Sequence, residues 1–152
     1  MPIKIHDNLP ARKLLQNEIV DVIDSSIAEK QDIRPLKFLL LNLMPKKLET
    51  EVQFARLLGA SPLQVELTLM TTKTYLPKNT QKEHLIEFYK TLDDIKNNFY
   101  DVLIITGAPV ETVPFKEVKY WNELKDIIFW SSKNVFRKIG ICWGAQALLK
   151  VL

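Results

Sequence analysis

The residue with the clearest chemical potential is Cys142, the only cysteine among 152 residues. It lies at the centre of Gly140-Ile141-Cys142-Trp143-Gly144, between a short apolar run and a helix-forming run. Glycines two residues to either side permit a tight strand-to-helix turn, which is the sulfur counterpart of the G-x-S-x-G nucleophile elbow. A helix N-terminus favours the reactive thiolate. We therefore predict that Cys142 is a nucleophile, and the alternative is an inert packed thiol.

A thiolate that attacks an acyl carbon needs hydrogen-bond donors aimed at the developing oxyanion, and backbone N–H groups can supply them. The N–H of Trp143, directly after the nucleophile, is one predicted donor. The turn at Gly107 and Ala108 is the second, because glycine lets the main chain approach a ligand closely. An ordinary strand-ending turn is the alternative interpretation of that segment.

Two lysines, Lys46 and Lys47, follow a buried strand at what should be the same edge of the sheet. A cation there could hold a phosphate or a carboxylate of a substrate. The alternative is a pair of solvated lysines at a helix start, although the helix dipole disfavours cations in that position.

A cysteine nucleophile normally works with a general base, and the sequence has only His6 and His84. We expect His6 to lie in an irregular N-terminal segment and His84 to be solvated on a surface helix, so neither is predicted to be the base. The sequence contains no metal-ligand cluster, P-loop or G-x-G-x-x-G motif.

Strand-like and helix-like runs alternate along the chain, which predicts a parallel α/β sheet with ligands bound at the carboxyl ends of the strands. Three loops should meet there: 42–47, 107–113 and the turn at Cys142. Strands are expected at 36–43, 65–69 (half-buried, near a sheet edge), 101–106 and before Gly140. Helices are expected at 48–59, 80–89 (opened by a Thr80–Glu83 capping box), 120–131 and after Cys142.

We divide the chain into an N-terminal extension, 1–35, packed on an α/β domain, 36–152. The extension should hold a short helix at 10–17 and an edge strand at 19–23. The last residues lie inside an apolar helical run without a closing signal, which predicts the N-terminal portion of a longer protein. A natural short domain with a docked last helix is the alternative.

The composition excludes several classes of function. The net charge of +3 comes from 21 basic and 18 acidic residues spread along the chain, so no nucleic-acid partner is expected. No apolar run reaches the length of a membrane span. The single cysteine suits a reducing compartment, and a cytoplasmic protein is expected.

Together the motifs resemble the homoserine O-acyltransferase family of methionine biosynthesis, also called homoserine trans-succinylases. They are M-P-I at the start, I-R-P-L-K at 33–37, L-N-L-M-P-K-K at 41–47, E-T-E at 49–51, S-P-L-Q-V at 61–65, T-G-A-P at 106–109, Y-W at 120–121 and C-W-x-x-Q-A at 142–147. The resemblance implies a class I glutamine amidotransferase-like (flavodoxin-like) fold, truncated here, since family members are about twice as long. It also implies that Cys142 takes an acyl group from acyl-CoA and passes it to the hydroxyl of homoserine, assisted by a histidine and a glutamate beyond residue 152.

In this family the residue after T-G-A-P-x influences the acyl group, and glutamate goes with acetyl while glycine leaves room for succinyl. Glu111 occupies that position, so acetyl-CoA is the expected co-substrate and succinyl-CoA the less favoured one. A carboxylate there would also repel the free carboxylate of a succinyl group. No tightly bound cofactor and no metal are expected.

Three alternatives remain open. Some relatives resemble serine O-acetyltransferases, so serine could replace homoserine as the acceptor. The segment G-I-C-W-G-A-Q also resembles the G-I-C-x-G-x-Q elbow of class I glutamine amidotransferases, which usually have histidine where Ala145 stands. The chain could also be a catalytically incomplete fragment, inactive alone and prone to associate, and a homodimer is expected.

Overall fold

Near-continuous apolar runs form the central strands of the sheet in the computed structural model, which describes residues 3–18, 22–23, 34–75 and 82–152. The strands are β1 (Ile3–Lys4), β2 (Val22–Ile23), β3 (Leu36–Leu41), β4 (Val65–Met70), β5 (Tyr89–Lys90), β6 (Tyr100–Ile105) and β7 (Val135–Gly140). The helices are α1 (Ala11–Asn17), α3 (Lys47–Gly59), α4 (Lys82–Phe88), α5 (Leu92–Ile95), α6 (Trp121–Asn134) and α7 (Trp143–Val151), with a 3₁₀ turn at Phe115–Glu117.

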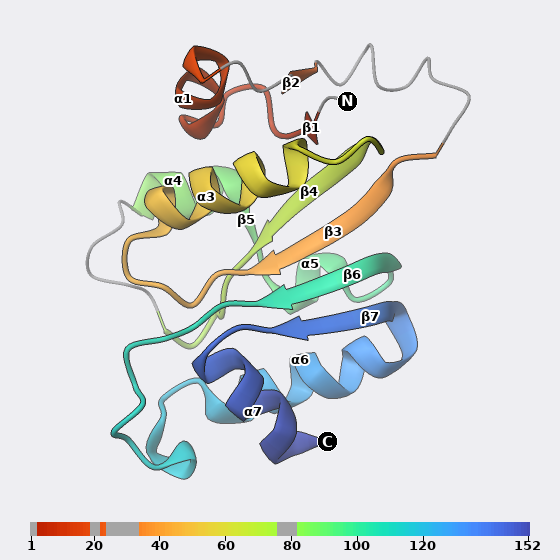
Figure 1. Ribbon diagram of the computed structural model, residues 1–152. Coiled ribbons are helices and arrows are strands. Elements are labelled where there is room, and N and C mark those ends of the chain that lie inside the picture. Colours follow the sequence, from red (N-terminus) through yellow and green to blue (C-terminus); the bar gives the residue numbers. More distant parts are fainter. Residues whose placement is uncertain (1–2, 19–21, 24–33, 76–81) are drawn as a thin grey trace.

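All strand pairs in the described sheet are parallel, in the order β2-β1-β4-β3-β6-β7, and β5 pairs with β4 (Figure 1). The register aligns Leu39 of β3 with Thr68 of β4 on one side and with Leu103 of β6 on the other. Parallel strands need crossover connections, and α3 and α6 supply them between the central strands. The predicted parallel α/β sheet is confirmed.

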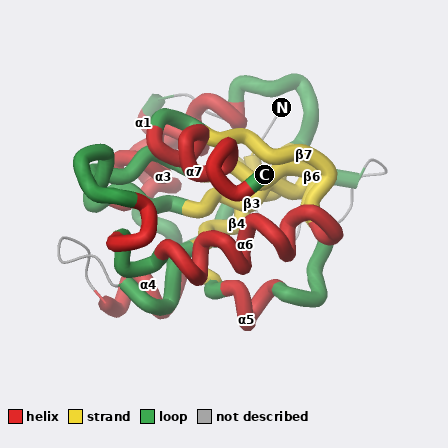
Figure 2. Tube along the Cα trace, turned by 90° about the horizontal axis from the view of Figure 1, so that it is seen from below, coloured by secondary structure: helices red, strands yellow, loops and turns green. Residues whose placement is uncertain are grey.

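Alternate residues of the central strands bury two separate cores, because successive side chains point to opposite faces of a sheet. Leu39 and Leu41 pack in a cluster with residues of α5, α6 and α7, whereas Leu40 packs in a second cluster with residues of α1, α3 and α4. Figure 2 shows α1 and α3 on one side of the sheet and α5 and α6 on the other. Both faces of the C-terminal half of β3, formed by Leu39, Leu40 and Leu41, are therefore buried, while Lys37 is exposed.

One predicted feature of the sheet is wrong. The strand at 65–69 was expected near an edge, but β4 lies inside the sheet because the two-residue strand β1 pairs with it through Ile3 and Val65. The helix expected at 80–89 is present as α4; it ends one residue earlier than expected, at Phe88, because Tyr89 begins β5. Thr80 of the predicted capping box and residues 19–21 of the predicted edge strand lie outside the described residues, while Val22–Ile23 forms the strand β2.

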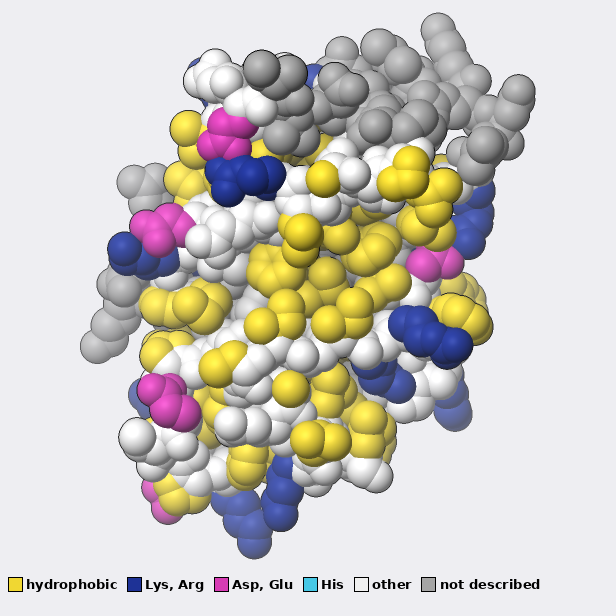
Figure 3. Space-filling view, in the orientation of Figure 1, with side chains coloured by type: hydrophobic (Ala, Val, Ile, Leu, Met, Phe, Trp, Pro, Cys, Tyr) yellow, Lys and Arg dark blue, Asp and Glu magenta, His cyan; other side chains and the backbone are white. Residues whose placement is uncertain are grey.

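One face of the molecule carries exposed apolar side chains over β6 and β7, between α3 and α7 (Figure 3). On β7, Ile139 is 45% exposed and is paired with Ile104, whereas Phe136, which is 73% exposed, points to the opposite face of the sheet. None of the described helices is long and apolar enough to cross a membrane.

Candidate functional site

Cys142 lies at a strained turn between β7 and α7. Its φ of 53° is the only positive φ of a non-glycine residue in the described part of the chain. Such a backbone conformation is costly for a side chain with a Cβ and is found most often at functional sites. The thiol is exposed. The predicted strand-to-helix elbow is therefore present, with the strain on the cysteine itself.

The two flanking glycines are required by close packing and not by a positive φ. A Cβ built on Gly140 would lie 2.5 Å from the Cα of Ala145, and one on Gly144 would lie 2.4 Å from the carbonyl oxygen of Ile105. Both distances are too short for any real Cβ. Gly140 therefore packs against the backbone at the start of α7 and Gly144 against the end of β6, and neither position has room for a side chain.

Trp143 anchors the start of α7. Its side chain is 1% exposed and contacts the rings of Phe115, Tyr120 and Trp121. Trp143 is the first residue of the helix, so its N–H has no acceptor within α7. The buried indole therefore holds in place, next to Cys142, an N–H group that donates no backbone hydrogen bond to any residue the structure describes.

The turn at Gly107 lies directly against the nucleophile candidate. A Cβ on Gly107 would lie 3.7 Å from Cys142 Sγ, and Ile141 N donates to the carbonyl oxygen of Ile105 over 2.9 Å. Within the described chain, neither the Gly107 nor the Ala108 N–H donates a backbone hydrogen bond. The structure thus brings three predicted site residues, Cys142, Trp143 and Gly107, to one edge of the sheet.

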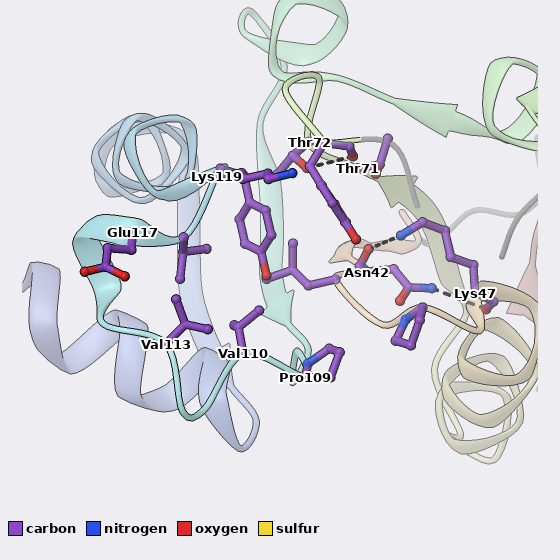
Figure 4. A pocket seen from close by; sticks show the side chains of 14 residues that line it. Asn42, Lys47, Thr71, Thr72, Pro109, Val110, Val113, Glu117 and Lys119 are labelled. Carbon is purple, nitrogen blue, oxygen red and sulfur yellow. Dashed lines mark hydrogen bonds between the residues drawn. The ribbon is translucent and has the colours of Figure 1, made fainter. Parts of the chain in front are cut away.

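A pocket of about 480 Å³ opens at the same edge, beyond the ends of β3, β4 and β6 (Figure 4). Asn42 and Lys47 line one side, and Pro109, Val110 and Val113 line another. Cys142 is not among the lining residues.

The pocket also includes residues that sequence reasoning missed: Thr71, Thr72, Tyr75, Lys119 and Tyr120. The first three follow β4, and the rule that ligands bind beyond the carboxyl ends of parallel strands could have identified them.

The two candidate lysines have different surroundings. Lys46 is exposed and pairs with Glu49 over 3.1 Å, whereas Lys47 is 3% exposed and lines the pocket. Lys47 Nζ donates to the main-chain oxygen of Asn42 and lies 5.3 Å from the centre of the Tyr89 ring. Burial lowers the pKa of Lys47 to about 8, and the nearby Glu51 carboxylate opposes that decrease.

The expectation that His84 is simply solvated is wrong. Its side chain is 14% exposed, and Nε2 lies 3.0 Å from Oε1 of the fully buried Glu51. The prediction failed because Glu51 lies on α3, more than thirty residues away in sequence. His6 accepts a hydrogen bond from Asn8 N, and in the described part of the chain neither histidine hydrogen-bonds Cys142.

Glu111 lies in the exposed loop after β6, between Val110 and Val113, which both line the pocket. Glu111 itself is not one of the lining residues. No cluster of three or more metal-ligating side chains is found among the residues that the structure describes.

Comparison with known proteins gives one consistent result. The family described as "Homoserine O-succinyltransferase" matches residues 2–152. Three similar curated proteins are named homoserine O-acetyltransferase, from Shouchella clausii (56% identity), Acetivibrio thermocellus (55%) and Bacillus subtilis (54%). The alignments cover 97–98% of this chain and 48–49% of those proteins. The chain therefore spans about half the length of the curated relatives it matches.

Proposed function

The chain belongs to the homoserine O-succinyltransferase family, and from that premise we propose that it carries the nucleophile of an acyl-CoA-dependent homoserine O-acetyltransferase of methionine biosynthesis. One observation carries the proposal more than any other. The exposed thiol of Cys142 lies on a strained elbow with the Gly107 backbone beside it. This arrangement suits acyl transfer through a covalent intermediate.

In the first step, a base takes the proton of the Cys142 thiol, Sγ attacks the thioester carbonyl of acetyl-CoA, the bond to the CoA sulfur breaks, and CoA leaves as its thiol with the proton that the base returns. In the second step, the hydroxyl oxygen of homoserine attacks the acetyl-cysteine. A base takes the hydroxyl proton, and Cys142 leaves as the thiolate. The Trp143, Gly107 and Ala108 N–H groups are the proposed donors to the oxyanion of both tetrahedral intermediates.

The base in this proposal is a histidine outside these 152 residues, paired with a glutamate, as the family resemblance implies. His84 is committed to Glu51 instead. We accordingly expect the 152-residue chain alone to be inactive, and we assign the finer fold to the class I glutamine amidotransferase-like group. The exposed apolar face over β6 and β7 supports an incomplete 36–152 domain, with 1–35 as its extension.

Lys47 is the proposed anion-binding residue of the pocket. Its ammonium is the buried cation among the lining groups. A phosphate or carboxylate of a substrate would form a charge-assisted hydrogen bond with it and compensate for the hydration that burial removes. Lys46, proposed alongside it from the sequence, faces Glu49, which leaves Lys47 as the stronger candidate.

The acyl group is assigned to acetyl through Glu111. Its carboxylate lies on the loop between two pocket-lining valines, where it would repel the free carboxylate of succinyl-CoA. We further propose a cytoplasmic homodimer.

Steady-state acyl transfer by the full-length protein tests this function. We expect CoA release from acetyl-CoA to depend on homoserine and to disappear in Cys142→Ser, with succinyl-CoA the poorer donor. Thermal unfolding of the variant controls for folding. Release that depends on serine instead would move the assignment to a serine O-acetyltransferase. Glutamine hydrolysis without acyl transfer would replace it with an amidotransferase.

A further inference from the structure

A chain of buried polar groups extends from the pocket into the space between α3, α4 and β5. Lys47 Nζ donates to the main-chain oxygen of Asn42, and Asn42 Nδ2 donates to Tyr89 Oη over 2.9 Å. Tyr89 Oη donates in turn to Glu51 Oε1 over 2.6 Å, and His84 Nε2 lies 3.0 Å from the same oxygen. The sequence indicated none of these contacts.

Glu51 is the unusual member of this network because its side chain is fully buried. Oε1 accepts a hydrogen bond from Tyr89 Oη, and the ionised carboxylate would accept a second from the tautomer of His84 that carries its hydrogen on Nε2. Oε2 is buried and forms no hydrogen bond with any described residue. A buried carboxylate with an unpaired oxygen is costly unless a positive charge compensates for it.

Lys47 is the cation that interacts electrostatically with Glu51, without a direct ion pair between the two side chains. It lies four residues before Glu51 on α3, so the two side chains share one face of the helix. The Glu51 carboxylate favours the protonated lysine, whereas burial opposes it. Without Glu51, the lysine at the pocket would become neutral more readily.

We propose that Glu51 is a positioning residue for Lys47: its buried carboxylate, held by Tyr89 and His84, keeps the Lys47 ammonium charged and fixed at the pocket wall for an anionic group of the substrate. The inference rests on the proposed role of Lys47. His84 has a defined part in it, because its Nε2 holds the carboxylate and its ring packs on Phe88 at a centroid distance of 4.9 Å. Among the described residues, the ionisable side chains that interact with Glu51 in this network are Lys47, His84 and Tyr89.

The first test is an NMR titration of the Lys47 ammonium in the full-length protein, in Glu51→Gln and in the control Glu49→Gln. Glu49 lies on the same helix but faces Lys46 at the surface. Removing the Glu51 charge should lower the pKa of Lys47 by about one unit, whereas Glu49→Gln should leave it unchanged. At about pH 8 the charged fraction of Lys47 would fall roughly fivefold, and KM for acetyl-CoA should rise about fivefold with little change in kcat.

An unchanged Lys47 pKa in a folded Glu51→Gln protein would overturn the inference, because a merely structural Glu51 would lower stability alone. The titration needs no turnover. If the Lys47 pKa falls in Glu51→Gln as expected but Cys142 is never acetylated, the electrostatic coupling is supported and the proposed function is rejected.

The second test covers the case in which Glu51→Gln does not fold. Removing one member of a buried charge pair leaves the other uncompensated, so Glu51→Gln should destabilise the protein, whereas Lys47→Met loses the attraction to Glu51 but also removes the buried ammonium. The double variant should then be more stable than the sum of the two single effects predicts, or should fold where Glu51→Gln does not. Strictly additive losses, or a double variant no better than Glu51→Gln, would contradict the coupling.

Discussion

Gly107 packs against Cys142 so closely that a Cβ on the glycine would lie 3.4 Å from Cys142 Cβ and 3.7 Å from Sγ. The contact joins the turn after β6 to the elbow after β7, which are neighbouring parallel strands. The Cys142 thiol remains exposed beside this contact. A larger residue at position 107 should therefore hinder access of a substrate to the thiol while changing the stability of the fold little.

The first prediction concerns Gly107→Ala. The added methyl group makes only ordinary van der Waals contacts, so the free energy of unfolding should change by less than about 1 kcal/mol. The methyl group would nevertheless occupy the space an acyl oxygen needs, and acetylation of Cys142 should slow about a hundredfold. Single-turnover acetylation together with chemical denaturation measures both effects. If Gly107→Ala acetylates Cys142 at the wild-type rate, the turn at Gly107 does not form part of the oxyanion site.

Gly144→Ala should have the opposite profile. A Cβ there would lie 2.4 Å from the carbonyl oxygen of Ile105, which belongs to the backbone of a central strand and cannot move away cheaply. We expect a loss of about 3 kcal/mol or more in the free energy of unfolding. Denaturant unfolding checks this, with Gly107→Ala as the matched glycine-to-alanine control. Equal stability of the two variants would show that the elbow packs differently.

Lys47 should give the protein a distinct pH dependence of stability. Its pKa falls from 10.5 in the unfolded chain to about 8 in the fold, through burial. Between these values the unfolded chain binds the additional proton, so the free energy of unfolding rises with pH in that window. The destabilising effect of the buried charge is fully present below about pH 8.

Denaturant unfolding from about pH 7 to about pH 10, compared with Lys47→Met, isolates this contribution, which should not exceed roughly 3 kcal/mol. The Lys47→Met protein should lack the rise assigned to Lys47. Identical pH profiles for the two proteins would mean that Lys47 titrates as an ordinary surface lysine.

Glu111→Gly should widen the choice of acyl donor. Glu111 is exposed in the loop after β6, so the substitution should leave the free energy of unfolding within about 0.5 kcal/mol. Removing the carboxylate eliminates its repulsion of a succinyl group, and kcat/KM for succinyl-CoA relative to acetyl-CoA should rise about tenfold or more. Glu117→Gly, which alters a lining residue of the pocket, serves as a comparison. If the ratio of kcat/KM for succinyl-CoA to that for acetyl-CoA is unchanged in Glu111→Gly, Glu111 does not determine which acyl group is used.

The elbow could be predicted from sequence because its requirements are local. Gly140 and Gly144 are needed where the chain turns onto α7, and the apolar run before them forms β7 as expected. The strand β3 was equally clear, since its residues are almost all apolar and its second half is covered on both faces.

What could not be predicted depends on contacts between distant segments. β1 and β5 have two residues each, too few for a periodic pattern, yet they place β4 inside the sheet and Tyr89 beside Glu51. The burial of Lys47 and the Glu51–His84 contact likewise arise only when α3, α4 and β5 pack together. Local patterns carry no information about such pairs.

The central claim is that an acyl group is carried on Cys142, and peptide mass spectrometry of the full-length protein after brief exposure to acetyl-CoA tests it most directly. We expect one acetyl group on the peptide that contains Cys142, lost on treatment with hydroxylamine or homoserine and absent in Cys142→Ser. Acetyl-CoA consumption in the presence of homoserine with no modification of Cys142, or with the same turnover in Cys142→Ser, would contradict it.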